Sequence, residues 1–134
     1  MREDRNLVEG SSERRGFLRV PFETELEITS REDGTTVRST SSKDISLKGI
    51  YCLTEEPFPK DTPCSIRLHV SGTRSKLWLE LEGHVVRTDD TGMALSFDAM
   101  ELDVFIHLKN ILYYNSGEPE RIDEEIMRFN ENET

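Results

Sequence analysis

Apolar and polar residues alternate in several segments of the chain after Val20, which is the period of a strand with one buried face. In VPFETELEITS, residues 20–30, the apolar side chains occupy even positions and Thr24 lies on the same face. KLWLELEGHVVRTDD repeats the pattern with Gly83 in the apolar register, where a glycine predicts a bulge, a bend or a close backbone approach. Six segments are predicted to be strands: 20–30, 36–46, 49–59, 62–72, 76–90 and 91–97.

The apolar period changes to that of a helix after Phe97. Asp98 and Glu101 fit a capping box, which predicts Asp98 as the N-cap of a long helix. NSGEP is expected to end this helix, and Pro119 is expected to lie in the first turn of a second, shorter one.

These patterns divide the chain into three parts. Residues 1–13 are polar and carry mixed charge, so they are predicted to form a flexible leader. Residues 14–97 form a mainly β domain, and polar turns without helical crossovers favour a six-stranded antiparallel sandwich or small barrel. Residues 98–134 form a C-terminal extension of one or two helices.

Charge restricts the partners that such a domain can have. The net charge of −10 argues against a nucleic-acid binder and against an anionic membrane surface. Ten acidic and three basic residues follow position 97, so this extension carries −7 and the rest of the chain is near neutral. The acidic run from Asp123 to Glu125 is expected on a solvated helix face. A small anion therefore remains a suitable ligand for a local basic cluster.

Other sequence signals indicate a cytoplasmic protein that is not an enzyme. No apolar run is long enough to cross a membrane, and the N-terminus lacks the apolar core of a secretory signal. Cys52 and Cys64 lie in apolar strand segments and are interpreted as reduced core residues. The three histidines are scattered without ligand spacing, and no phosphate loop, nucleophile elbow or metal motif is present, so we expect no cofactor and no metal.

The segment RRGFLR contains three arginines just before the first predicted strand. Arg15 and Arg19 are four residues apart, so an extended segment projects both from one face and a turn brings them together. Their planar donors match a phosphate or the O6/N7 edge of guanine, and Arg14 offers a third fork or a stacking plane. The alternative is a basic leader that pairs with the acidic tail.

The segment KDISLKGIYC contains a second candidate, at the junction of the second and third predicted strands. The carboxylate of Asp44 can accept from the N1–H and 2-amino groups of guanine. Ser46 adds a short hydrogen bond, and Gly49 lets the backbone approach a flat ligand without a Cβ clash. The alternative is an ordinary hairpin turn, which prefers the same residue types.

Taken together, RGFLR and DISLKG resemble the paired motifs R-x-x-x-R and D/N-x-S-x-x-G of the PilZ domain family. The resemblance covers residues 13–97 and includes the EGHVVRTDDTGMALSF segment, which is similar to the last hairpin of such domains. It implies a six-stranded antiparallel β-barrel that binds cyclic di-GMP, a bacterial second messenger with two guanines and two phosphates.

The resemblance also implies a role for each motif residue. Arg15 and Arg19 bind phosphate and guanine edges. Asp44, Ser46 and Gly49 hold a guanine. Arg14 adds a stacking or phosphate contact. The segment RRGFLR, residues 14–19, is then an arm that orders when the ligand binds and relays the signal to an unidentified protein partner. The alternative keeps the fold but makes the protein an adaptor that acts through protein contacts without nucleotide. The sequence leaves ligand stoichiometry and formation of a homodimer open.

Overall fold

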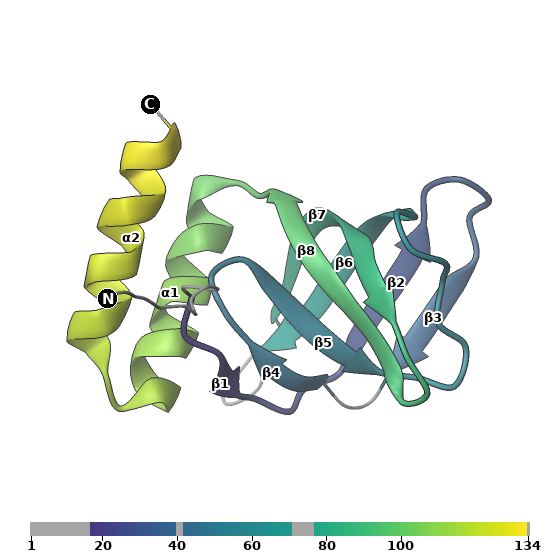
Figure 1. Cartoon of the computed structure of the whole chain (residues 1–134), viewed down its shortest axis with the longest axis horizontal. Coiled ribbons are helices and arrows are strands. Elements are labelled where there is room, and N and C mark those ends of the chain that lie inside the picture. Colours follow the sequence, from purple (N-terminus) through teal and green to yellow (C-terminus); the bar gives the residue numbers. More distant parts are fainter. Residues whose placement is uncertain (1–16, 40–41, 71–76, 134) are drawn as a thin grey trace, which may run out of the picture.

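A computed structural model describes residues 17–39, 42–70 and 77–133 of the 134-residue chain, so the predicted leader, residues 1–13, lies outside it. The described residues form one antiparallel sheet of eight strands followed by two helices (Figure 1). In chain order these are β1 (Val20–Pro21), β2 (Leu26–Ser30), β3 (Thr36–Ser39), β4 (Ser42–Ile45), β5 (Gly49–Leu53), β6 (Pro63–Val70), β7 (Leu77–Thr88), β8 (Gly92–Ala99), α1 (Leu102–Ser116) and α2 (Pro119–Glu133).

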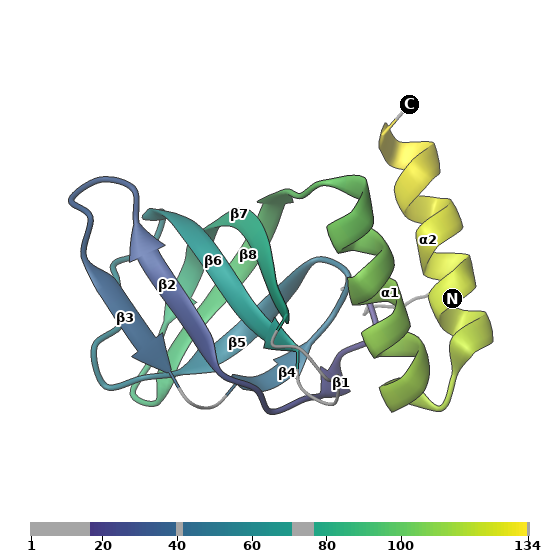
Figure 2. The ribbon, with the colours of Figure 1, turned by 180° about the vertical axis from the view of Figure 1, so that it is seen from behind.

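The sheet closes into a barrel because one extended segment contributes to both of its ends. The strand order is β1-β4-β5-β8-β7-β6-β2-β3, so β1 is one edge and β2 lies beside the other. Residues 22–25 connect the two strands, and the backbone N–H of Phe22 donates to Lys43 O at 3.2 Å. Ser42 N–H donates to Thr24 O, also at 3.2 Å, which holds the bend against the start of β4. The curved sheet is visible from both sides (Figures 1 and 2).

The mainly β antiparallel fold with C-terminal helices is as predicted, but the strand count is not. Segment 20–30 is divided into β1 and β2, and segment 36–46 into β3 and β4, so six predicted strands become eight. The alternation continues through the first bend because Thr24 stays buried there, where its hydroxyl donates to His69 O at 2.5 Å. A period-2 pattern therefore reports which side chains face inward and does not report where the strand changes partners.

The core fills the barrel and extends beneath α1. Inward-facing side chains of the strands form one apolar cluster with Leu108 and Leu112 of α1 and with Ile122 of α2. Cys52 and Cys64 lie in this cluster as free thiols, as predicted, and burial raises the pKa of Cys64 to about 11. Both helices lie at the same end of the barrel, with α1 between the strands and α2 (Figure 2).

The helix boundaries correct two predictions. Strand β8 continues to Ala99, so Asp98 is not an N-cap; its carboxylate instead contacts His84 Nδ1 at 2.9 Å across the β7–β8 pair. Helix α1 begins after Glu101, which occupies the N-cap position without a side-chain capping bond. Gly117, with φ of 71°, ends α1, and Pro119 opens α2 as predicted. The second helix is not shorter, because each helix has 15 residues.

The acidic run on α2 divides between solvent and core. Asp123 and Glu124 are exposed, as predicted for a solvated helix face. Glu125 is completely buried, so the prediction is wrong for this residue. It lies one turn after the buried Ile122, on the side of α2 that meets the rest of the molecule.

Gly83 occupies a bulge where β7 changes register against β8. A Cβ built at this position would lie 2.0 Å from Ser96 O, a backbone atom that cannot move without disturbing the ladder. We therefore expect Gly83→Ala to lower the free energy of unfolding by about 1–3 kcal/mol, measured by urea denaturation. Glu82→Ala, a change at the adjacent exposed residue, serves as the control and should stay within about 0.5 kcal/mol of the parent. Equal stability of the two variants would contradict the close approach.

Candidate functional site

The arm before β1 is held against β4 by an ion pair between the two sequence motifs. Arg19 donates from Nε to Asp44 Oδ1 at 2.8 Å, and its Nη2 lies 2.7 Å from the same oxygen. The antiparallel pairing of Pro21 with Asp44 brings Arg19 beside Asp44, although Arg19 and Asp44 are 25 positions apart in the sequence. Arg14 and Arg15, the other two predicted arginines, lie outside the described residues. The structure thus places Arg19 of the first motif in contact with Asp44 of the second motif.

Ser46 shapes the turn that follows Asp44. Its side chain is buried, and its Oγ accepts from Lys48 N at 3.1 Å and from Gly49 N at 3.2 Å. The backbone N–H of Ser46 donates to Gly49 O at 2.9 Å and closes the β4–β5 hairpin. These bonds fix the turn and with it the position of the carboxylate at the end of β4. Contact of Ser46 with a ligand stays a prediction.

Gly49 is required by the sheet itself. A Cβ there would lie 2.2 Å from Leu95 O, because β5 and β8 approach closely at this point. The absence of a side chain therefore lets two strands pair, whatever it also allows a ligand to do. The three residues of the second motif have different structural tasks: Gly49 admits β8, Ser46 fixes the turn, and Asp44 faces the arm.

A row of residues across the outer face of the barrel extends this site. Asp44 on β4 pairs with Tyr51 on β5, Tyr51 pairs with Ala94 on β8, and Ala94 pairs with Arg87 on β7. Lys43 Nζ and the guanidinium carbon of Arg87 each lie 5.7 Å from the centroid of the Tyr51 ring. Sequence analysis missed these two cations, because only the register of four strands brings them together.

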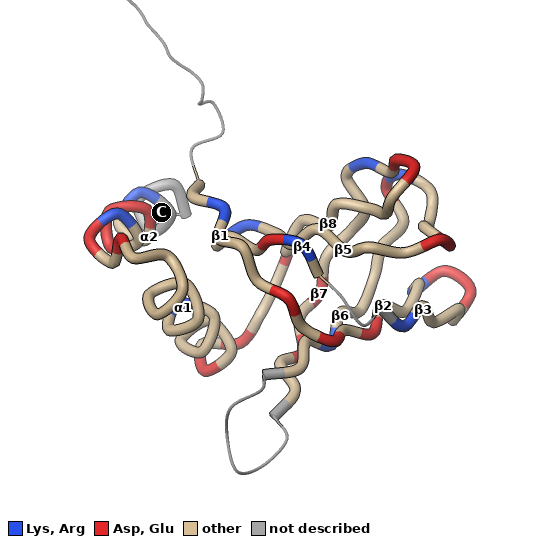
Figure 3. The backbone as a smooth tube through the Cα atoms, turned by 90° about the horizontal axis from the view of Figure 1, so that it is seen from below, with Lys and Arg blue, Asp and Glu red and all other residues tan. Residues whose placement is uncertain are grey.

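The charges of this face are arranged in a small area. Where β1 meets β4, basic and acidic segments of the backbone lie next to each other (Figure 3). Arg19 and Asp44 offset one another. Beside Tyr51, Lys43 and Arg87 add two positive charges and Asp89 adds one negative charge, so a net positive charge remains. We define the Arg19–Asp44 pair together with Lys43, Tyr51 and Arg87 as the platform. Its charge pattern suits an anion that also carries hydrogen-bond donors.

Tyr51 is fixed at its other end by Asp89. The Tyr51 hydroxyl donates to the Asp89 carboxylate, which also accepts from Thr91 N at 2.9 Å and from Gly92 N at 3.0 Å. These bonds lower the pKa of Asp89 to about 2, and the bond from Tyr51 has the largest effect. Burial and the neighbouring carboxylate raise the pKa of Tyr51, so at neutral pH the pair consists of a phenol and a carboxylate. The ring that the two cations flank is therefore held in one orientation.

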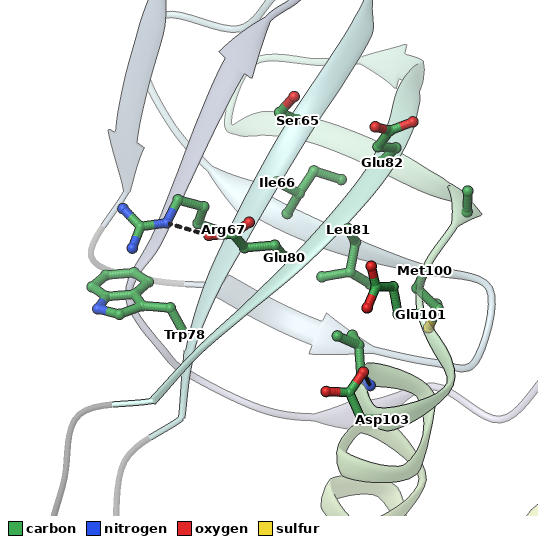
Figure 4. A pocket seen from close by; sticks show the side chains of 12 residues that line it. Ser65, Ile66, Arg67, Trp78, Glu80, Leu81, Glu82, Met100, Glu101 and Asp103 are labelled. Atoms are coloured by element: carbon green, nitrogen blue, oxygen red, sulfur yellow. Dashed lines mark hydrogen bonds and ion pairs between the residues drawn. The ribbon is translucent and has the colours of Figure 1, made fainter.

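A cavity of about 670 Å³ lies elsewhere, between β6, β7 and the start of α1 (Figure 4). Its lining carries four carboxylates, those of Glu80, Glu82, Glu101 and Asp103. Arg67 also lines it, but its guanidinium stacks on Trp78 at 4.7 Å and lies 3.7 Å from Glu80, so its charge is already matched. An anion would be repelled from this cavity, which leaves the platform as the candidate anion site.

Within residues 17–39, 42–70 and 77–133, His, Cys, Asp and Glu form no group suited to hold a metal ion. Neither described helix combines the length and apolar character that a membrane crossing requires.

Comparison with known proteins identifies the kind of domain. The sequence model of the family described as "PilZ domain" matches residues 13–114, which extends beyond the barrel through most of α1. No enzymatic family is indicated, and no curated protein matches the chain.

Several solved structures share the fold, and two of them illustrate it. The structure of the Bacillus subtilis inhibitor of motility (MotI/DgrA) has a TM-score of 0.59 and 19% identity, and the match covers 71% of this chain and 47% of that one. The chain thus spans about half the length of that protein. The PilZ domain of CeSA from a cellulose-synthesizing bacterium has a TM-score of 0.58 and 17% identity, with 72% and 95% covered.

The lowered pKa of Asp89 predicts how stability depends on acid. Because the folded-state pKa is depressed, the carboxylate contributes stability above the pKa of the unfolded chain, near 3.8, and loses it as the pH falls toward about 2. Asp89→Asn should therefore be less stable than the parent at neutral pH, and the difference should shrink between about pH 4 and pH 2. Urea unfolding over this pH range tests it, with Asp90→Asn as the control. A pH-independent difference would rule out the tyrosine–carboxylate pair as its source.

Proposed function

The chain belongs to the PilZ domain family, and on that premise we propose that it is a cytoplasmic, non-catalytic receptor for cyclic di-GMP. The observation that carries this proposal is the ion pair between Arg19 and Asp44, which joins the arm to the turn-bearing strand. It supports a site in which the two motifs act together on one ligand.

The chemistry of this pair matches that of guanine. The guanidinium of Arg19 offers two donors to the O6 and N7 acceptors, and the carboxylate of Asp44 accepts from N1–H and the 2-amino group. In the structure the two side chains satisfy each other, at 48% and 24% exposure. An exposed pair of this kind contributes about 0–1 kcal/mol, so a guanine edge replaces it at little cost.

The phosphates of the ligand require further positive charge. We assign this to Arg15 of the first motif, with Arg14 as an additional stacking or phosphate contact, and to Lys43 and Arg87 of the platform. Ser46 and Gly49 complete the turn on which a guanine lies. A global charge of −10 does not prevent this, because charges farther away than about 10 Å are largely screened in physiological salt.

Ligand binding would then act as a switch. Ordering any residue of the arm that is free before binding costs about 1–2 kcal/mol, which several charged hydrogen bonds to guanine and phosphate offset. The rearranged arm and the neutralised platform present a changed surface to a protein partner.

A second candidate function is an adaptor that binds proteins through its helices and does not bind nucleotide. Three exposed apolar side chains favour it: Leu102, Tyr114 and Met127 are 74%, 88% and 64% exposed. All three belong to α1 or α2, the helices through which such an adaptor would bind its partner. The two functions differ in their requirement for the platform, and titration with cyclic di-GMP separates them.

The first test removes the pair. We expect Arg19→Ala and Asp44→Ala each to weaken cyclic di-GMP binding by at least about 100-fold in isothermal titration calorimetry, because each removes charge-assisted hydrogen bonds to guanine. The melting temperature should change little, since the exposed pair contributes about 0–1 kcal/mol. Arg38→Ala is the matched control: Arg38 pairs with Glu27 at 3.4 Å on the opposite edge of the sheet and should leave binding unchanged.

The adaptor function predicts a different outcome. It requires that the parent protein show no binding in the same titration. Binding that both variants retain at parental strength would instead place the ligand away from the Arg19–Asp44 pair. Loss of binding together with a large drop in melting temperature would instead mark the pair as structural.

The second test concerns the two cations beside Tyr51. Lys43→Ala and Arg87→Ala should each weaken binding about three- to tenfold, as expected for exposed charges near phosphate, and the double variant should flatten the salt dependence of the dissociation constant. Lys60→Ala, at an exposed loop residue, controls for loss of one positive charge. Unchanged binding in the double variant would restrict the site to the two motifs.

A further inference from the structure

Helix α2 contacts the arm at the residue before Arg19. The backbone N–H of Leu18 donates to Glu125 Oε2 at 2.8 Å, and Arg121 Nε lies 3.4 Å from the same oxygen. The Glu125 side chain is 0% exposed, whereas Glu124 beside it faces solvent. Its other oxygen, Oε1, is buried and finds no hydrogen-bond partner among the described residues. A buried carboxylate on α2 is thus directed at the backbone of the arm.

The residue before Leu18 connects α2 to the second motif. Two cations contact the ring of Phe17: Lys48 Nζ lies 5.7 Å from its centroid, and the guanidinium carbon of Arg128 lies 6.0 Å from it. Lys48 belongs to the turn between Asp44 and Gly49, and Arg128 belongs to α2. Residues 17–19 are therefore held from two sides, by α2 at Phe17 and Leu18 and by the barrel at Phe17 and Arg19.

A carboxylate at this position has a cost that an apolar residue would not have. Burial raises the pKa of Glu125, although Leu18, Arg121 and Arg128 act in the opposite direction. Ile122 and Ile126, on the same side of α2, pack against the core without any such penalty. The carboxylate therefore does not serve packing. Its specific effect is to fix one backbone N–H of the arm, next to the arginine that reaches Asp44.

We propose that Glu125 is a positioning residue for cyclic di-GMP and that it couples helix α2 to the ligand site. This inference rests on the proposed function. Glu125 keeps residues 17–19 in the conformation in which Arg19 faces Asp44, so the ligand does not have to order them. Apparent affinity falls in proportion to the population of the competent state, so loss of this contact weakens binding. Because such coupling is reciprocal, bound ligand also holds α2 more firmly on the molecule.

Three variants of α2 test the proposal. Glu125→Leu keeps the approximate volume and removes the acceptor, and we expect binding about tenfold weaker or more by calorimetry. Glu125→Gln keeps an oxygen for Leu18 N–H and should stay within about threefold of the parent. Glu124→Leu makes the same change at the exposed neighbour and should leave binding unaltered. Parental or tighter affinity of the Glu125→Leu variant for cyclic di-GMP would overturn the proposal.

Hydrogen exchange measured by NMR separates positioning from a general loss of stability. In the absence of ligand, Leu18 N–H should exchange slowly in the parent and in Glu125→Gln, and rapidly in Glu125→Leu, while core amides of β6 and β7 keep their protection. Saturating cyclic di-GMP should slow exchange along residues 119–133 in the parent and fail to do so in Glu125→Leu. Exchange in α2 that does not respond to ligand in the parent would overturn the coupling.

Failure of this inference differs from failure of the proposed function. If the parent protein does not bind cyclic di-GMP, the receptor proposal fails and the coupling fails with it. The exchange rate of Leu18 N–H without ligand still decides whether Glu125 holds the arm. If the parent binds and the Leu variant binds equally well, the receptor stands and the role of α2 is disproved.

Discussion

The pairing of β1 with β4 is the contact on which both the barrel and its candidate site depend. It consists of two residue pairs, Val20 with Ile45 and Pro21 with Asp44. Because β1 continues through a bend into β2, this short ladder joins the two ends of the sheet. The same ladder sets Arg19, one residue before β1, beside the carboxylate of Asp44. Closure of the fold and assembly of the platform are therefore one event, and a chain that closed in another register would separate the motifs.

Electrostatics distinguish the two faces on which a partner or ligand could bind. The cavity beside α1 is lined by carboxylates and holds one arginine that is already stacked on Trp78 and paired. The platform instead combines a self-neutralised pair with two cations beside a fixed tyrosine ring. Concavity alone favours the cavity beside α1 as the binding site, whereas the chemistry of the proposed guanine dinucleotide favours the platform. At an exposed site, complementary donors and charges decide specificity more than enclosed volume does.

The sequence predicts what depends on local pattern and fails where partner choice decides. The local pattern located the six strand segments, and the resemblance of the two motifs assigned Arg19 and Asp44 to one ligand site. The structure places these two side chains in contact with each other. The split of segment 20–30 was missed because the buried Thr24 keeps the period intact through the bend. Asp98 matched a capping pattern that the longer β8 overrode. The positions of Lys43 and Arg87 beside Tyr51 depend on strand register, and the burial of Glu125 depends on the packing of α2. Neither leaves a local signal in the sequence.

The balance of forces on α2 explains why a single carboxylate could matter there. Within residues 119–128, whose side chains are described, Ile122 is the one apolar side chain that is completely buried, and Ile126 is partly so. Burying one such residue stabilises by about 1.5–3 kcal/mol, and a hydrogen bond to a charged group contributes about as much. The bond from Leu18 to Glu125 is therefore comparable to the apolar contact that docks the helix. Loss of a contact of this size changes the docked population of the helix, and the arm supplies the donor of that contact.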